Sequence, residues 1–179
     1  MRSTKQARRR AARAKRIVRP CLERLEERTV PSLVAAYALD EGSGATFADA
    51  SGNGNAGTTT NTSWSSAGKY GAALQFSGAT NSLATISDSP SVDLTTGLTL
   101  EAWVKASTLN NAASDGWVAA VSKDNKASSA NDISYALYAA NGTATPPALH
   151  LLIGGKDVGL QGTSVLTLNT WVFLAATYD

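Results

Sequence analysis

The sequence contains very little of the residues that carry thiol and imidazole chemistry. Among 179 residues there is one cysteine, Cys21, and one histidine, His150. A single cysteine excludes an internal disulfide and every zinc site built on several cysteines, and a single histidine excludes metal sites that use two imidazoles. The sequence also lacks a run of about 18 apolar residues, the length that a membrane-spanning helix needs. It therefore predicts neither a disulfide framework nor a membrane span.

Positively charged residues are few in most of the chain. After Pro31 there is no arginine, and 5 lysines stand against 11 aspartates and glutamates, whereas residues 1–30 hold 11 lysines and arginines against 3 glutamates. All 15 glycines follow residue 41. This asymmetry divides the chain into a basic leader, residues 1–32, and an acidic segment, residues 33–179. The acidic segment is long enough for one domain and too short for two ordinary domains.

The leader lacks the apolar stretch of about 7–15 residues that defines a secretory signal peptide. Its composition fits a solvated, mostly disordered tail with a short helix after Pro20, and its charge alone fits binding to nucleic acid or to an anionic membrane. We favour a third interpretation, which is a resemblance. Arg8-Arg9-Arg10 followed by LERLEERTVPS (residues 22–32) resembles the Arg-rich LExLExRxxPS leader of some large bacterial surface and secreted proteins. The resemblance implies a role in export or envelope sorting.

From residue 33 on, apolar runs of strand length are separated by clusters of Gly, Asn, Asp and Ser. In residues 98–105 apolar and polar positions alternate with a period of two, the pattern of a half-buried strand. No part of this segment keeps a helical period, so the crossover helices of a parallel α/β fold are not expected. The segment therefore predicts an all-β fold of short antiparallel strands. The predicted strands are residues 33–39, 72–77, 83–87, 98–105, 117–122, 133–139, 148–154 and 171–178.

Four segments occur in a specific order: YALDEGSGATFADASGNGNAGT (37–58), GKYGAALQFSG (68–78), LTLEAWVKAS (98–107) and NTWVFLAATYD (169–179). In order and spacing they resemble the laminin G-like, concanavalin A-like domains of large bacterial extracellular proteins. The resemblance implies a two-sheet antiparallel jelly-roll sandwich over residues 33–179. It also implies that the family pattern continues past Asp179. We therefore expect an incomplete sandwich with an unpaired sheet edge, an uncovered apolar face and marginal stability.

The loop at residues 49–55 is the first candidate site. Calcium takes about 6–8 oxygen ligands, and the loop offers the side chains of Asp49, Asn53 and Asn55 together with glycines that let backbone carbonyls approach. In the resembled family this loop often helps to hold a structural calcium ion. The alternative is a plain turn rich in Asx and Gly. We predict Asp49, Asn53 and Asn55 as calcium ligands.

The aromatic side chains of these segments are expected to pack in the core of the sandwich. Trp103 shares its strand face with Glu101 and Lys105, so it is expected to be only partly covered. Trp64 and Trp117 have loop-like neighbours, and we predict them as solvent-facing platforms for sugar rings, with core packing as the alternative. A polar stretch beside Trp117 is either a second contact surface or a solvated loop. It comprises Asp115, Lys123, Asp124, Asn125, Lys126, Asn131 and Asp132.

The sequence offers little for catalysis. Glycoside hydrolysis needs two positioned carboxylates, and after Ser32 the only glutamates, Glu41 and Glu101, are far apart in the sequence. His150 lies in the apolar run ALHLLIG, where it is expected to face outward or to lie at an edge. It has no carboxylate or nucleophile close to it in the sequence. We therefore predict that the protein is not an enzyme.

Together these observations predict a non-enzymatic binding module, extracellular or on the cell surface, that contacts glycans or protein partners. Two alternatives stay open: a structural or adhesive spacer without a small ligand, and an accessory domain of a larger glycan-active enzyme. Nucleic acid is not favoured as a partner, because the basic charge belongs to the leader. Calcium is the one cofactor that the sequence suggests.

Overall fold

The structure is a computed structural model that describes residues 32–179 except residues 80, 111–115, 125–132 and 154. From Leu33 to Asp179 the described residues form one unit. The predictions made for the leader, including the short helix after Pro20, lie outside the described residues.

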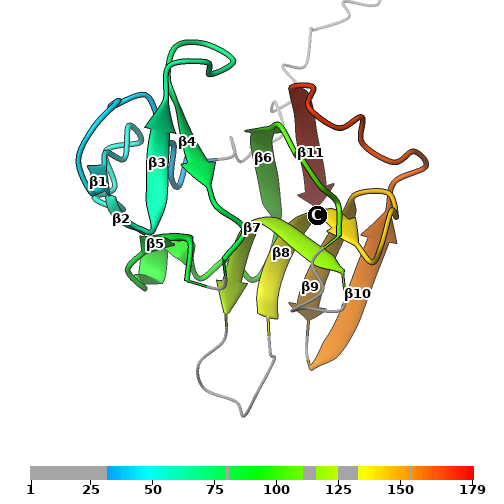
Figure 1. The fold of residues 1–179 in the computed structure, drawn as a ribbon. Helices are drawn as coiled ribbons and strands as arrows, with labels where there is room; N and C mark the ends of the chain where they lie inside the picture. The colour runs from blue at the N-terminus through cyan, green and yellow to red at the C-terminus, as the bar shows by residue number, and fades with distance from the viewer. Residues whose placement is uncertain (1–31, 80, 111–115, 125–132, 154) are drawn as a thin grey trace, which may run out of the picture. The chain divides into compact units, whose positions relative to one another are not determined.

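The described residues form antiparallel strands and a short 3-10 helix, so the predicted all-β fold class is confirmed (Figure 1). In this part of the chain no helix is long and apolar enough to cross a membrane. The 3-10 helix η1 (Pro90–Val92) lies between β5 and β6. The strands are β1 (Thr46–Phe47), β2 (Gly57–Thr60), β3 (Thr62–Ser65), β4 (Ala73–Phe76), β5 (Leu83–Ile86), β6 (Leu98–Val104), β7 (Trp117–Asp124), β8 (Ile133–Asn141), β9 (Ala148–Ile153), β10 (Lys156–Gln161) and β11 (Val172–Tyr178).

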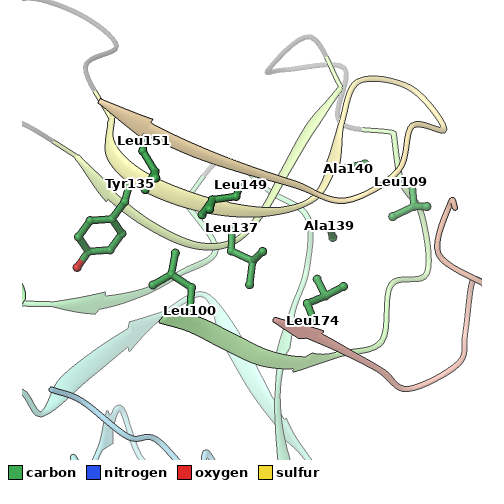
Figure 2. Close-up of a cluster of buried hydrophobic side chains, with 9 residues drawn as sticks. All are labelled: Leu100, Leu109, Tyr135, Leu137, Ala139, Ala140, Leu149, Leu151 and Leu174. Atoms are coloured by element: carbon green, nitrogen blue, oxygen red, sulfur yellow. The ribbon is translucent and has the colours of Figure 1, made fainter. Parts of the chain in front are cut away.

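The main hydrophobic core lies between two groups of strands. One is a four-stranded sheet with the order β10-β9-β8-β7, and the other is the pair β11-β6. Buried side chains from both groups point toward each other and fill the space between them (Figure 2). The remaining strands form a three-stranded sheet, β1-β2-β5, and a second pair, β3-β4. The buried cluster comprises Leu100, Leu109, Tyr135, Leu137, Ala139, Ala140, Leu149, Leu151 and Leu174.

The strand β6 confirms the predicted alternation. Its even-numbered residues are buried or half-buried and its odd-numbered residues are exposed, and β11 repeats this pattern. The register pairs Ala102 with Leu174 and Trp103 with Phe173, and directly opposite residues share a face of the sheet. One face of the pair therefore closes the core, and the other face is open to solvent.

The prediction of a strand at residues 33–39 is wrong, because this segment forms no strand in the structure. Side chains of the loop at residues 49–55 satisfy its backbone instead. The N–H of Ala36 donates to Asp49 Oδ1 at 3.0 Å, and the carbonyl of Val34 accepts the Asn55 amide at 3.0 Å. An apolar run shows that a segment is suited to burial, but a strand also needs a neighbouring strand to pair with.

Sequence patterns did not predict β1, β2, β3 and β10. The strands β2 and β3 are made mostly of Thr, Ser and Gly, and every residue of β10 is exposed. These segments form strands because a neighbouring strand pairs with them, and not because of an apolar pattern in their own sequence. The strand β10, for example, pairs with β9 along its whole length.

Candidate functional site

Three exposed aromatic side chains meet on the solvent face of the β6-β11 pair. The rings of Trp103 and Phe173, which are register partners, have centroids 5.3 Å apart. Tyr70, from the turn before β4, meets Trp103 edge to face, with centroids 5.7 Å apart and an angle of 84° between the planes. The exposed fractions are 75% for Tyr70, 39% for Trp103 and 47% for Phe173. We call these three residues the aromatic surface.

Lys69 covers one side of the aromatic surface. Its Nζ lies 4.6 Å from the Trp103 ring centroid and 5.6 Å from that of Tyr70, within the range of cation–π attraction. The turn that carries Lys69 and Tyr70 depends on glycine. The N–H of Gly68 donates to the carbonyl of Gly71 at 2.9 Å, and a Cβ on Gly68 would collide with the backbone carbonyl of the following segment. This turn therefore sets where the two side chains lie over β6.

Polar groups continue along the same face of the β6-β11 pair. Glu101 is the register partner of Ala175, whose small side chain leaves room beside the carboxylate. Further along, the hydroxyls of Thr99 and Thr177 lie 3.1 Å apart. The face thus presents aromatic rings, then a carboxylate, then two hydroxyls. Such a surface can stack on the C–H side of a sugar ring and hydrogen-bond to its hydroxyls.

The aromatic surface includes residues that the sequence did not mark as ligand contacts. The expectation of core packing is wrong for Tyr70 and Phe173, and also for Phe76, which is 49% exposed. Trp103 is partly covered, as predicted. Two sequence signals could have identified Phe173 and Tyr70 as exposed residues. Phe173 has the same strand phase as Thr177, and Tyr70 follows Lys69 in a turn flanked by glycines.

Trp117, predicted as a sugar platform, begins β7 and is half-buried. Its ring meets Tyr138 and His150 edge to face, with centroids 4.6 Å and 4.7 Å away. Tyr138 is 5% exposed, and burial raises the pKa of its hydroxyl, with the charges of Asp124 and Asp157 adding to the effect. Trp117 thus belongs to a packed aromatic group on the four-stranded sheet, and only part of its surface is open to a ligand.

Trp64, the other predicted platform, lies in β3 and is also half-buried. Its indole Nε1–H donates to the carbonyl of Gly44 at 2.9 Å. This bond holds the indole against the turn before β1. Trp64 and Trp117 do not join the aromatic surface.

The β9-β10 hairpin brings a carboxylate to His150 that sequence spacing did not reveal. His150 Nδ1 lies 3.5 Å from Asp157 Oδ1, and the two side chains are 24% and 70% exposed. The register places Gly159 opposite His150, so no side chain covers the imidazole from that position. The arrangement is an ion pair when the histidine is protonated.

Of the predicted polar stretch, only Lys123 and Asp124 lie within the described residues. Lys123 Nζ pairs with Asp88, and with Asp93 at 3.0 Å. Desolvation alone would lower the pKa of Lys123, but the hydrogen bonds and charges of Asp88 and Asp93 outweigh it and raise the pKa. Lys123 therefore ties β7 to the segment around η1.

Asp49 is the centre of a hydrogen-bonded loop. Its Oδ1 accepts the N–H of Ala36 at 3.0 Å and of Ser51 at 2.9 Å, and its Oδ2 accepts the Ser51 hydroxyl at 2.8 Å and the Asn55 N–H at 2.9 Å. Desolvation acts to raise the pKa of the Asp49 carboxyl, but these bonds outweigh it and hold the pKa well below its usual range. Burial, with the charge of Asp49, raises the pKa of Tyr37 to about 12.

Asn55 extends this network to distant segments. It is 4% exposed, and its Nδ2 donates to the Val34 carbonyl and to Ser91 Oγ, both at 3.0 Å. Its Oδ1 accepts the hydroxyls of Ser89 at 2.8 Å and Ser91 at 3.1 Å. Its backbone carbonyl accepts the Tyr37 hydroxyl at 2.7 Å. One side chain thus joins the loop to the first described segment and to η1.

The three predicted calcium ligands lie in one loop, but their arrangement does not fit calcium. Hydrogen-bond donors already face both carboxylate oxygens of Asp49 and the amide oxygen of Asn55. Asn53 turns its amide nitrogen to the carbonyls of Leu33 at 2.8 Å and Val34 at 3.0 Å. Within the described ranges, no three His, Cys, Asp or Glu side chains form a group able to hold a metal. The loop holds the chain by hydrogen bonds, and a calcium titration is the test of the calcium binding that the sequence predicts.

Comparison of the chain with protein-family models, with curated proteins and with solved structures finds no match. The candidate site is therefore interpreted from its own geometry.

Proposed function

We propose that residues 33–179 form a non-enzymatic binding module of an extracellular or cell-surface protein, and that the module contacts carbohydrate through the aromatic surface. The observation that carries this proposal is the group of three exposed rings, Tyr70 and Phe173 each meeting Trp103, on the solvent face of β6-β11. Contiguous exposed apolar patches on soluble domains mark interaction sites. The neighbouring carboxylate and hydroxyls favour a ligand that has both apolar faces and hydroxyl groups.

We also propose that the fold is a laminin G-like jelly-roll sandwich. Two features support this assignment: the ordered series of four resembling segments, and the packing of the four-stranded sheet on the β6-β11 pair. The resemblance of the leader to bacterial export leaders supports a location outside the cell. A protein partner is the alternative to carbohydrate.

A glycan array probed with the full chain tests the carbohydrate proposal. We expect the wild-type chain to bind a subset of glycans. We expect Tyr70→Ala and Trp103→Ala to weaken that binding by roughly tenfold, about 1.4 kcal/mol, because each removes a stacking ring. Phe76→Ala is the matched control, since it removes a ring of similar exposure outside the aromatic surface. Circular dichroism of each variant separates lost affinity from lost folding.

Two results would contradict this proposal. If no glycan binds the wild-type chain, the spacer alternative is favoured. If Trp117→Ala abolishes binding while Tyr70→Ala keeps it, the ligand lies at Trp117, one of the two platforms that the sequence predicts.

A further inference from the structure

Two asparagines of this chain are followed by glycine, and the fold restrains them differently. Asn53-Gly54 lies in the loop at residues 49–55, and Asn141-Gly142 lies at the end of β8. Asparagine is a thermolabile residue, because the backbone nitrogen of the next residue can attack its side-chain amide carbon. A following glycine favours this attack, since it has no Cβ in the way and its backbone rotates freely. The local structure around each pair therefore decides whether it reacts.

The surroundings of Gly54 leave its backbone nitrogen free to react. Asn53 and Gly54 are both exposed, and among the described residues no group accepts the N–H of Gly54. A Cβ built on Gly54 would meet nothing within 4 Å. The Asn53 amide nitrogen does make hydrogen bonds, but they lie at the exposed surface, where water can replace them. The peptide unit thus has room to turn toward the side chain.

The second pair is held from several sides. Asn141 is the last residue of β8, its N–H donates to Thr145 Oγ1 at 3.0 Å, and its Oδ1 accepts Gln161 Nε2 at 2.8 Å. The backbone of Gly142 is closely approached as well, because a Cβ on Gly116 would lie 2.7 Å from its carbonyl carbon. The Asn141 side chain and the following peptide cannot come together unless this end of the strand opens.

We propose that the fold leaves Asn53 as a site of spontaneous deamidation, and that the conversion releases residues 33 and 34 from the loop at residues 49–55. The nitrogen of Gly54 loses its proton and attacks Cγ of Asn53, and the amide nitrogen leaves as ammonia. Solvent water then opens the resulting cyclic succinimide at either carbonyl and gives aspartate or isoaspartate. Water is the only other reactant. The proposal does not depend on the proposed function.

The structural effect follows from the donors that Asn53 supplies. Its Nδ2 donates to the carbonyls of Leu33 at 2.8 Å and Val34 at 3.0 Å. Either product places a carboxylate there, so two attractive contacts become repulsive. The Val34 carbonyl keeps the Ser51 hydroxyl and the Asn55 amide as donors, whereas among the described residues the Leu33 carbonyl has no other side-chain donor. Deamidation therefore loosens the first residues after the leader, and it does so irreversibly.

The test is to age the full chain at mildly alkaline pH, folded and in urea. Mass spectrometry of proteolytic peptides follows the loss of amide at Asn53 and at Asn141. Hydrogen exchange of residues 34–36 is measured before and after ageing. Asn53→Asp imitates one product, and Asn61→Asp, which adds the same charge at another exposed turn, is its matched control. Asn53→Gln keeps an amide that cyclises much more slowly, so this chain should age without loosening.

We expect Asn53 in the folded chain to convert roughly tenfold or more faster than Asn141, which must wait for local opening of its strand. In urea the two rates should become similar. Exchange in residues 34–36 should speed up in the aged chain and in Asn53→Asp, but not in Asn61→Asp. The proposal is overturned if Asn53 keeps its amide, if Asn141 converts as fast in the folded chain, or if conversion leaves the exchange unchanged. A preference for Asn53 that persists in urea would overturn it as well, because the fold is then not the cause.

Discussion

The backbone N–H of Asn55 donates to Oδ2 of Asp49 at 2.9 Å, and this bond links the two residues whose side chains organise the loop at residues 49–55. Asp49 also holds the Ala36 N–H, whereas the side chain of Asn55 reaches the serines at η1. The two residues therefore connect three separate stretches of chain. Their contributions to folding can be measured independently.

We expect Asp49→Asn to lower the thermal unfolding temperature. One oxygen of Asp49 becomes an NH₂ group that faces N–H donors, so a favourable contact becomes a repulsive one. Thermal unfolding followed by circular dichroism measures the effect. Asp40→Asn, at an exposed position, is the control and should change little. Equal shifts in the two variants would show that the hydrogen bonds of Asp49 are not the cause.

The stability contributed by Asp49 should depend on pH with a defined sign. The folded-state pKa of Asp49 is depressed, so its contribution is present above the unfolded-state value of about 3.9 and is lost as the pH falls from there toward the folded-state pKa. We expect the unfolding temperature of the wild-type chain to fall in this acidic range more than that of Asp49→Asn. Unfolding temperatures of both chains across a pH series provide the comparison. If the unfolding temperatures of the two chains change equally with pH, the stabilising role assigned to the ionised Asp49 is contradicted.

Asn55→Ala should destabilise the domain by about 1–3 kcal/mol. The substitution removes the hydrogen bonds that this buried side chain makes with the Val34 carbonyl and with the hydroxyls of Ser89 and Ser91. Urea unfolding gives the free energy difference. Asn53→Ala serves as the comparison because Asn53 is exposed, and its effect should be smaller. A larger loss of unfolding free energy in Asn53→Ala than in Asn55→Ala would contradict the role assigned to the Asn55 network.

Calcium should not bind the loop at residues 49–55. Both carboxylate oxygens of Asp49 already accept hydrogen bonds, from Ser51 and Asn55 within the loop and from Ala36 outside it. We expect isothermal titration with calcium to give no heat beyond dilution, and the unfolding temperature to be the same with calcium and with a chelator. A saturable heat that disappears in Asp49→Asn would instead support the calcium site that the sequence predicts.

Gly68→Ala should weaken ligand binding at the aromatic surface without contacting the ligand. Its Cβ would collide with a backbone carbonyl, so the turn must move and carry Lys69 and Tyr70 away from Trp103. On the glycan array we expect a loss similar to that of Tyr70→Ala. Gly78→Ala, in a turn with open space around the Cβ, controls for the loss of a glycine, although its positive φ adds strain. Unchanged binding in Gly68→Ala would show that the turn does not position the surface.

Local patterns predicted those parts of the fold whose burial repeats along one strand. The alternation in residues 98–105 placed Trp103 on a partly open face, and the structure agrees. The same type of signal failed at residues 33–39, where the apolar run found side-chain partners and no neighbouring strand. It also failed for Tyr70, because a turn residue has no strand phase from which exposure could be read.

The sequence by itself determined the class of the fold, because strand-length apolar runs and glycine-rich breaks are properties of neighbouring residues. It also brought Asp49, Asn53 and Asn55 together, since they lie within one loop. Only the tertiary structure decided what these residues do and where the open surfaces lie. The Asp49 oxygens meet donors from Ala36 and Asn55, and Tyr70, from the turn before β4, meets Trp103 on β6. Such contacts depend on which strands pack together, and pairing between distant segments is not encoded in local periodicity.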